Sequence, residues 1–249
     1  MAVIATDLDG TLIDHEDATH AALLALYGKI DAAPSRPRLI YNTGRSPTLY
    51  AELAGTVPLR EPDVLICSVG TEVILQGGTC DAAWEKHLDD GGWDGDVAKA
   101  AVAAHCPDAT LQQTSEQRRH KLSFKLHDEA QADALAAALP PWARVVFSGG
   151  EDLDVIPQRA GKGEALKFVL AELGAAPERT LVCGDSGNDK LMLGLDGVKA
   201  CVVGNAMAEL VAWMETERQN GRADHVFYDS GLRCSYAIAA ALERFGLLL

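Results

Sequence analysis

The chain has 249 residues, a length at which one large domain or two modest domains fit. Hydrophobic residues make up 48% and charged residues 23% of the chain, which is ordinary for a globular protein. The formal net charge of -14 argues against nucleic-acid binding, because a phosphate backbone requires a basic surface. An anionic substrate must therefore be met by local cations and a metal.

The cysteines and histidines follow no zinc-binding pattern. The six cysteines include no CxxC pair, and Cys67, Cys183 and Cys201 lie in apolar runs typical of buried free thiols. The seven histidines include no HExxH motif. Neither a charged-then-apolar leader nor an apolar run of about 18 residues is present. We expect a reduced, cytoplasmic protein without a membrane span, or one that has lost a transit peptide.

The most informative stretch is residues 2–12, AVIATDLDGTL. Its apolar start and its glycine turn predict a buried strand of a parallel sheet. Asp7 and Asp9 follow that strand, and ligands of open α/β sheets bind just beyond the carboxyl ends of strands. The spacing of two residues lets both carboxylates face one side.

Two carboxylates this close repel each other unless a cation joins them. Mg2+ is the natural partner, because it prefers oxygen ligands and keeps waters that a phosphate can replace. One carboxylate can then act as a nucleophile that forms an acyl-phosphate, and the other as acid and base. A strand end with an Asp-Gly turn and no chemistry is the alternative, which the DxD pattern alone leaves open.

The next elements along the chain read as a helix and a second strand. Residues 16–30 carry alanine and leucine at helical spacing, and Pro34 and Pro37 end that pattern. Residues 38–42 form the predicted strand, and residues 49–53 begin another helix. A glycine turn that leads into a helix presents backbone N–H groups to an anion.

The turn itself is Thr43-Gly44-Arg45-Ser46-Pro47. Thr43 adds a hydroxyl donor and Arg45 a guanidinium group, so the turn is a candidate phosphate site together with Gly44. An ordinary helix start, with Ser46 as N-cap and Pro47 in the first turn, is the alternative. The two interpretations are compatible.

Residues 63–68 form a third apolar strand, and the chain then turns at Glu72 into a β-rich segment at residues 73–75. Glu72 could bond a polyol, although an isolated acidic residue is more often solvated. His120 and Lys121, in an alternating strand pattern, could point into a cleft between domains or into solvent.

Composition changes between residues 77 and 158, which predicts an inserted α+β cap between two parts of a core, 1–76 and 159–249. The elements expected in the cap are helices at 96–105 and 129–139 and strands at 119–126, 144–148 and 153–156.

Core character returns at Lys162, which lies between two glycines and opens a helix at residues 164–173. This places a point charge close to an anion, although a stray surface lysine in a glycine-rich cap is the alternative. A strand at 179–183 then ends in GDSGND. Two acids and an amide there, Asp185, Asp189 and Asn188, could complete an oxygen cage for Mg2+, or form an Asx-rich turn without a ligand.

The C-terminal part continues the alternation of strands and helices. Strands are expected at 198–203 and 225–228, helices at 190–193, 206–217 and 235–245, and an exposed loop at 215–222.

Together the motifs DLDGT, NTGRS, GKG and GDSGND resemble the haloacid dehalogenase superfamily of aspartyl phosphotransferases. The resemblance covers the whole chain and implies an α/β fold, a doubly wound Rossmann-like parallel sheet with an inserted α+β cap of the Cof-type branch. Within that branch the stretches SVGTE, HKLSF and DLDVIPQRAGKGEAL are most similar to the sucrose-6-phosphate phosphatases. Relatives with other sugars commonly carry NGA where this chain has VGTE.

The resemblance implies a role for each motif. Asp7 is the nucleophile and Asp9 the acid and base. The phosphoryl group is bound by Thr43, Lys162 and Asn188, beside Gly44 and Arg45. Mg2+ is held by Asp7, the Asp9 carbonyl and Asp185, with Asp189 in support. The expected contacts to sugar hydroxyls are Glu72, Lys121, Asp154 and, next to Lys121, His120.

The implied activity is Mg2+-dependent hydrolysis of sucrose 6-phosphate to sucrose and phosphate through an aspartyl-phosphate, the final step of sucrose synthesis. Alternatives are a phosphatase for another sugar phosphate such as mannosyl-3-phosphoglycerate, a phosphosugar mutase, and a silent binding module of sucrose-phosphate synthase. The expected partners are a sugar phosphate and that synthase, but neither nucleic acid nor a membrane. We expect a monomer.

Overall fold

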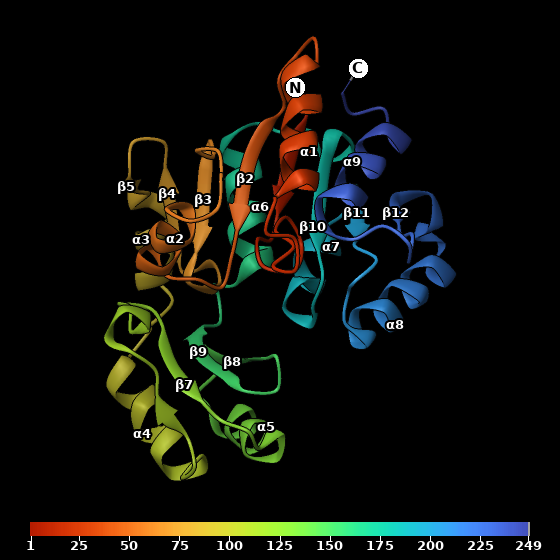
Figure 1. The fold of residues 1–249 in the computed structure, drawn as a ribbon. Coiled ribbons are helices and arrows are strands. Elements are labelled where there is room, and N and C mark those ends of the chain that lie inside the picture. Colours follow the sequence, from red (N-terminus) through yellow and green to blue (C-terminus); the bar gives the residue numbers. More distant parts are fainter. Residues whose placement is uncertain (249) are drawn as a thin grey trace.

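The computed structural model describes residues 1–248, whose largest feature is an eight-stranded sheet (Figure 1). The strand order is β12-β11-β10-β1-β2-β3-β4-β5, parallel from β12 to β3 and antiparallel for β4 and β5. The strands are β1 (Val3–Thr6), β2 (Arg38–Asn42), β3 (Val64–Cys67), β4 (Glu72–Leu75), β5 (Thr79–Cys80), β10 (Thr180–Gly184), β11 (Lys199–Val202) and β12 (Val226–Phe227).

Helices cover both faces of this sheet because alternate strand residues point to opposite sides. Ile4 packs with helices α1 (Ala21–Ala32), α2 (Pro47–Ala54) and α9 (Cys234–Arg244). Val3 and Ala5 pack toward the opposite face. The helices there are α3 (Ala82–Asp89), α6 (Lys162–Glu172), α7 (Lys190–Leu193) and α8 (Ala208–Glu217). This confirms the predicted doubly wound α/β core.

A second, antiparallel sheet of four strands lies apart from the first, in the lower part of Figure 1. Its order is β6-β7-β9-β8, and helices α4 and α5 share a hydrophobic cluster with it. The elements are α4 (Gly95–His105), β6 (Thr110–Leu111), β7 (Leu122–Lys125), α5 (Glu129–Ala138), β8 (Ala143–Ser148) and β9 (Asp152–Pro157). We call this unit the cap.

The boundaries of the cap at residues 77 and 158 remain a proposal. Strand β5 pairs with β4 of the large sheet, and Trp84 and Leu88 of α3 belong to the hydrophobic cluster beneath that sheet. This packing favours a first boundary near residue 90, because residues 79–89 are held by the core. The apolar residues of this amphipathic helix gave no sequence signal for which unit it would join.

Three element predictions differ from the structure. The strand predicted at 119–126 begins only at Leu122, because Arg118 and Lys121 exchange backbone hydrogen bonds in a turn before it. Helix α1 begins at Ala21 rather than at residue 16, because Asp17 accepts hydrogen bonds from the N–H groups of Thr19 and Ala21 in a preceding turn. Residues Arg218–Arg222 continue α8 as a wider helical turn rather than forming a loop. There the guanidinium group of Arg222 donates to the carbonyls of Leu193 and Leu195, which holds the segment against the core.

Other local predictions are confirmed. Ser46 caps α2 by accepting the N–H of Leu49, and Pro47 occupies the first turn. Cys67, Cys183 and Cys201 are buried free thiols. Within residues 1–248, no helix is both long and apolar enough to cross a bilayer. Short helical turns lie at Ser68–Gly70, Thr114–Glu116, Pro177–Arg179, Gly187–Asp189 and Ala223–His225.

Candidate active site

The order of the strands places the candidate site at the carboxyl end of β1, a central strand of the sheet. From β1 the chain builds β2 and β3 on one side, and later returns to build β10, β11 and β12 on the other. Connections that leave in opposite directions open a crevice beyond the carboxyl ends of the two strands. Asp7 directly follows β1 and Asp185 directly follows β10, so the crevice receives a carboxylate from each.

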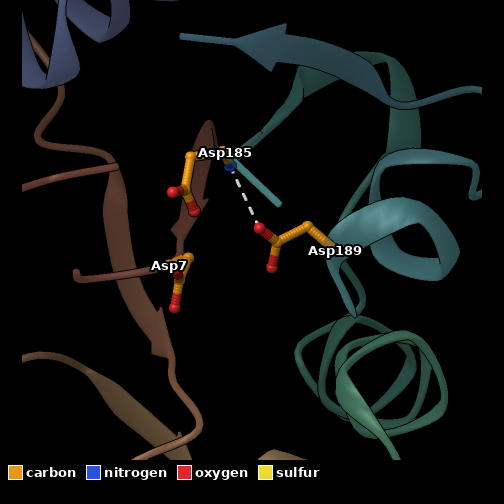
Figure 2. Close-up of side chains that lie close together, drawn as sticks. All are labelled: Asp7, Asp185 and Asp189. Carbon is orange, nitrogen blue, oxygen red and sulfur yellow. Dashed lines mark hydrogen bonds between the residues drawn. The ribbon is translucent and has the colours of Figure 1, made fainter. Parts of the chain in front are cut away.

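Three carboxylates meet there, as Figure 2 shows. Oxygens of Asp7, Asp185 and Asp189 lie within 4.8 Å of one another. The ammonium group of Lys162 lies 2.8 Å from Oδ1 of Asp7 and 2.7 Å from Oδ1 of Asp189. One ammonium group does not balance three buried or half-buried carboxylates. The cluster therefore suits a divalent cation that prefers oxygen ligands.

The pKa values of these groups reflect the imbalance. Burial raises the pKa of Asp7 well above its ordinary value, although Lys162 opposes the shift. Burial and the charge of Asp189 raise the pKa of Asp185 to about 6. Burial lowers the pKa of Lys162, but Asp189 and Asp7 outweigh it and hold the value above the ordinary one. Without a cation, ionising all three acids is unfavourable.

Hydrogen bonds fix the loops that carry the acids. Thr11 donates its hydroxyl to Oδ1 of Asp185 at 3.1 Å, which ties the turn after β1 to the turn after β10. Asp189 accepts the backbone N–H of Asp185 at 3.0 Å, drawn as the dashed line in Figure 2. Gly10 has a φ of +71°, and a Cβ there would lie 2.6 Å from Oδ2 of Asp185. Only glycine satisfies both constraints at this position.

Asp9 has different partners. Arg45 donates to both carboxylate oxygens of Asp9 at 2.7 Å, and Nε2 of His15 lies 2.7 Å from Oδ1. Burial alone would raise the pKa of Asp9, but the hydrogen bonds from Arg45 and His15 hold it below its ordinary value. In this arrangement Asp9 is an ionised carboxylate bound to a guanidinium group.

The turn after β2 lies beside these acids. Thr43 is buried, and its hydroxyl oxygen accepts the backbone N–H of Arg45 at 3.2 Å. Gly44 and Arg45 line a cleft of about 440 Å3 between the core and the cap. The predicted residues that line it together are Asp7, Asp9, Gly44, Arg45, Lys162, Asp185 and Asn188 from the core and Lys121 and Asp154 from the cap.

Four predicted residues do not line this cleft. Thr43 and Asp189 lie buried behind the lining residues. Glu72 accepts hydrogen bonds from Arg118 and from Ser68 instead. His120 is 4% exposed, and its Nε2 lies 2.8 Å from Asp89. The structure therefore directs Glu72 and His120 toward protein partners.

Sequence reasoning missed Glu116. This residue is 4% exposed, lines the cleft, and accepts a hydrogen bond from Lys121 on Oε2 at 3.1 Å. Its Oε1 is buried and has no hydrogen-bond partner among the described residues. Glu116 lies in the charged run TSEQRRHK, which is typical of a solvated surface, so the sequence offered no signal of its burial.

The model of the family described as sucrose-6F-phosphate phosphohydrolase matches residues 1–246. The chain belongs to this family. The predicted resemblance to the haloacid dehalogenase superfamily, and to its sucrose-6-phosphate phosphatases, is thereby confirmed.

One relative is sucrose-phosphatase 1 of Nicotiana tabacum, which is 37% identical over 98% of this chain. The chain spans 59% of the length of that relative. The mannosylfructose-phosphate phosphatase of Agrobacterium fabrum is 32% identical over 99% of this chain and 98% of its own length.

A solved structure of the sucrose-phosphatase from Synechocystis, in complex with sucrose and phosphate, superposes with a TM-score of 0.85. It is 29% identical and covers 98% of both chains. The match extends over the core and the cap alike, so the arrangement of the two sheets is that of a sucrose-phosphatase.

Proposed function

We propose that this chain is a Mg2+-dependent phosphatase that hydrolyses sucrose 6-phosphate to sucrose and phosphate. The observation that carries the proposal is the cluster of Asp7, Asp185 and Asp189 around Lys162 on the core side of a cleft whose cap side is polar. Membership of the sucrose-6F-phosphate phosphohydrolase family supports the substrate. Release of free sucrose would be the last step of its synthesis, which makes the synthase that forms sucrose phosphate a natural partner.

The acidic cluster fits Mg2+ because it holds unbalanced negative charge and offers oxygen ligands only. Asp7, the backbone carbonyl of Asp9 and Asp185 would hold the ion, and Asp189 would support it through Lys162 and the N–H of Asp185. When bound, the ion neutralises charge on the phosphoryl oxygens and keeps Asp7 ionised.

Asp7 is proposed as the nucleophile. Its carboxylate oxygen attacks phosphorus, the bond between phosphorus and the sugar oxygen breaks, and an aspartyl-phosphate forms. Water then cleaves this acyl-phosphate and releases inorganic phosphate. The 2.8 Å contact with Lys162 fixes one oxygen of Asp7 and leaves the carboxylate oriented toward the cleft. The phosphoryl oxygens would be met by Lys162, Asn188, Arg45 and the donors of the Thr43-Gly44 turn.

Asp9 is proposed as the acid and base, which requires it to carry a proton when the sugar oxygen leaves. Arg45 opposes this as long as both of its hydrogen bonds to Asp9 persist. A phosphoryl group in the cleft offers Arg45 another anionic partner, so substrate binding would release Asp9 from the guanidinium group. Protonated Asp9 then gives its proton to the leaving oxygen and takes one from the attacking water.

The sugar would be bound from the cap. Lys121 and Asp154 line the cleft, and Glu116 adds a buried carboxylate oxygen that lacks a donor. A sugar hydroxyl is a donor of the right kind, because it satisfies that oxygen without adding charge. The proposed sugar contacts are Lys121, Asp154 and Glu116.

Mannosylfructose phosphate is the second candidate substrate, because the phosphatase named for it matches this chain along nearly the whole length of both. The deciding experiment measures phosphate release from sucrose 6-phosphate, mannosylfructose phosphate and hexose 6-phosphates, each with Mg2+ and with chelator. We expect the highest kcat/KM for sucrose 6-phosphate, and none without the metal. A higher kcat/KM for mannosylfructose phosphate would transfer the assignment to that substrate, and isomerised product without free phosphate would indicate a mutase.

A further inference from the structure

Glu72 and Arg118 form an ion pair that joins the core to the cap. Glu72 lies in β4 of the large sheet, and Arg118 lies in the segment that leads into β7 of the cap. Nε of Arg118 donates to Oε2 of Glu72 at 2.9 Å, and its second nitrogen donates to Oε1 at 2.7 Å. The two side chains are 16% and 30% exposed, so this bidentate pair is better shielded than a surface ion pair.

The two residues after Arg118 also reach the core. Arg119 donates to Oδ2 of Asp89 at 2.9 Å, and Nε2 of His120 lies 2.8 Å from Oδ1 of the same carboxylate. Asp89 ends α3, which packs beneath the large sheet. Three consecutive cap residues therefore bind two core carboxylates. We call this set of five residues the clasp.

The clasp connects directly to the sugar side of the cleft. The backbone N–H of Arg118 donates to the carbonyl of Lys121 at 2.9 Å, and the N–H of Lys121 donates back to Arg118 at 3.2 Å. This tight turn directs the side chain of Lys121 toward Glu116 and Asp154, which line the cleft. Because the two residues are joined by this turn, the position of Arg118 on the core determines the position of Lys121 in the cleft.

On the core side, Glu72 connects to the phosphate side of the cleft. Ser68 donates its hydroxyl to Oε2 of Glu72 at 2.6 Å, and its backbone N–H donates to the carbonyl of Arg45 at 2.8 Å. Val69 follows with a φ of +58°, which a β-branched residue adopts only when its surroundings impose it. The N–H of Val69 donates to the carbonyl of Thr43 at 3.3 Å. These two backbone bonds hold Thr43 and Arg45 without involving Glu72, so Glu72 ties the already formed turn to the cap.

We propose that the clasp sets the distance between the sugar-binding turn of the cap and the phosphate-binding turn of the core, and that Glu72 and Arg118 are its positioning residues. This inference rests on the proposed function, since it assigns the two turns to the two parts of one sugar phosphate. The clasp governs how well a ligand bridges both turns. It has little effect on a phosphate ester that touches the core alone.

The test uses the single variants Glu72→Arg and Arg118→Glu, the double variant with both changes, and the control Lys29→Gln, which breaks an exposed ion pair between α1 and α9. Kinetics are measured with sucrose 6-phosphate and with p-nitrophenyl phosphate, which has no sugar. Each single variant is expected to raise KM for sucrose 6-phosphate about tenfold and to change kcat/KM for the aryl phosphate less than about twofold. The double variant is expected to recover most of the loss. The control Lys29→Gln is expected to keep the wild-type kinetics with both substrates.

Two results would overturn the clasp. Equal losses on both substrates would mean that the pair only maintains the fold. Losses that add in the double variant, without recovery, would mean that Glu72 contacts the sugar directly rather than through Arg118.

A readout without turnover separates the clasp from the proposed function. Amide hydrogen exchange at residues 66–72 and 116–123 should accelerate in each single variant and slow again in the double variant. That pattern would support the clasp even if the wild-type chain hydrolysed the aryl phosphate and no disaccharide phosphate, a result that would reject only the proposed substrate. Unchanged exchange in the single variants would reject the clasp.

Discussion

Two buried lysines, one on each side of the cleft, are each shared between carboxylates. In the core, Lys162 bonds two of three clustered carboxylates, Asp7 and Asp189, and leaves two negative charges unbalanced when all are ionised. In the cap, Lys121 lies between Glu116 and Asp154 and leaves one. The two sites differ in their excess negative charge. An excess of two charges in the core favours a divalent cation. In the cap the excess is one charge, and the one carboxylate oxygen without a partner favours a hydroxyl donor.

The local hydrogen bonds sharpen this comparison. In the core, Asp189 accepts two backbone N–H groups and Asp185 accepts the hydroxyl of Thr11, which orients these carboxylates without neutralising them. In the cap cluster, Ser123 donates to Asp154 and Lys121 to Glu116, and among its described side chains Oε1 of Glu116 remains without a donor. The core cluster therefore suits a cation, whereas the cap cluster suits a neutral hydrogen-bond donor.

Removing the proposed nucleophile should have the largest effect. Asp7→Asn is expected to lower kcat for sucrose 6-phosphate by at least on the order of 10^4, because an amide in place of the proposed nucleophile cannot form the acyl-phosphate. The measurement is phosphate release by purified protein. Thermal unfolding without metal is the control for folding, and Tm should hold or rise, since burial already disfavours the Asp7 charge. Turnover near the wild-type rate would remove Asp7 from its role.

Removing Mg2+ should abolish activity and adding it back should restore activity. The affinity for Mg2+ should depend on pH. A proton and Mg2+ compete for Asp185, whose pKa is raised to about 6. The increase in Tm on adding Mg2+ should be large at pH 8 and should shrink as pH falls below 6, by about a tenfold loss of affinity per pH unit.

The same shift sets the sign for the metal-free protein. The folded pKa of Asp185 lies above the ordinary value of 3.8, so the folded state binds the proton more tightly than the unfolded chain. Its contribution to stability is complete below pH 3.8 and is lost as pH rises through 6. A Mg2+ effect on Tm that is equal at pH 5 and pH 8 would contradict the involvement of Asp185.

Breaking the cap cluster should cost stability. Lys121→Met leaves Glu116 and Asp154 buried without a cation, which is expected to lower the free energy of unfolding by about 3 kcal/mol. The matched control is Lys125→Met at the end of β7, the strand that directly follows Lys121. There a 40% exposed lysine pairs with Glu151 and Asp152, and the cost should stay below about 1 kcal/mol. Urea unfolding measures both. Equal costs would mean that burial does not distinguish the two lysines.

The smallest expected effect tests the spare oxygen of the cap. Glu116→Gln keeps the shape but replaces one carboxylate oxygen with a donor, so Lys121 and a sugar hydroxyl can no longer both donate to this side chain. KM for sucrose 6-phosphate should rise about tenfold, whereas kcat/KM for p-nitrophenyl phosphate should stay unchanged. An unchanged KM for the sugar phosphate would place the sugar elsewhere in the cleft.

Much of the core was predictable from the sequence because strand ends in a parallel sheet share one edge. Strand β2 has the predicted bounds, Arg38–Asn42, and the acids at positions 7 and 185 follow β1 and β10. Buried strands announce themselves as apolar runs, and the polar residues that interrupt them stand out. The meeting of Asp7, Asp185 and Lys162 therefore follows from topology that local sequence already implied.

The cap and its contact with the core depended on tertiary structure. Residues 118–121 form one basic run in the sequence, yet three of its side chains bind core carboxylates and the fourth lies buried in the cleft. Glu72 was expected to contact the sugar, and in the structure both of its carboxylate oxygens accept hydrogen bonds from Arg118. A short polar segment carries no periodicity that tells a solvated charge from a paired one, since partners distant in sequence decide which it is. The sequence by itself determined which carboxylates meet at the core site, because they follow strands of one parallel sheet, and only the packing of cap against core decided which polar residues remain free for a ligand.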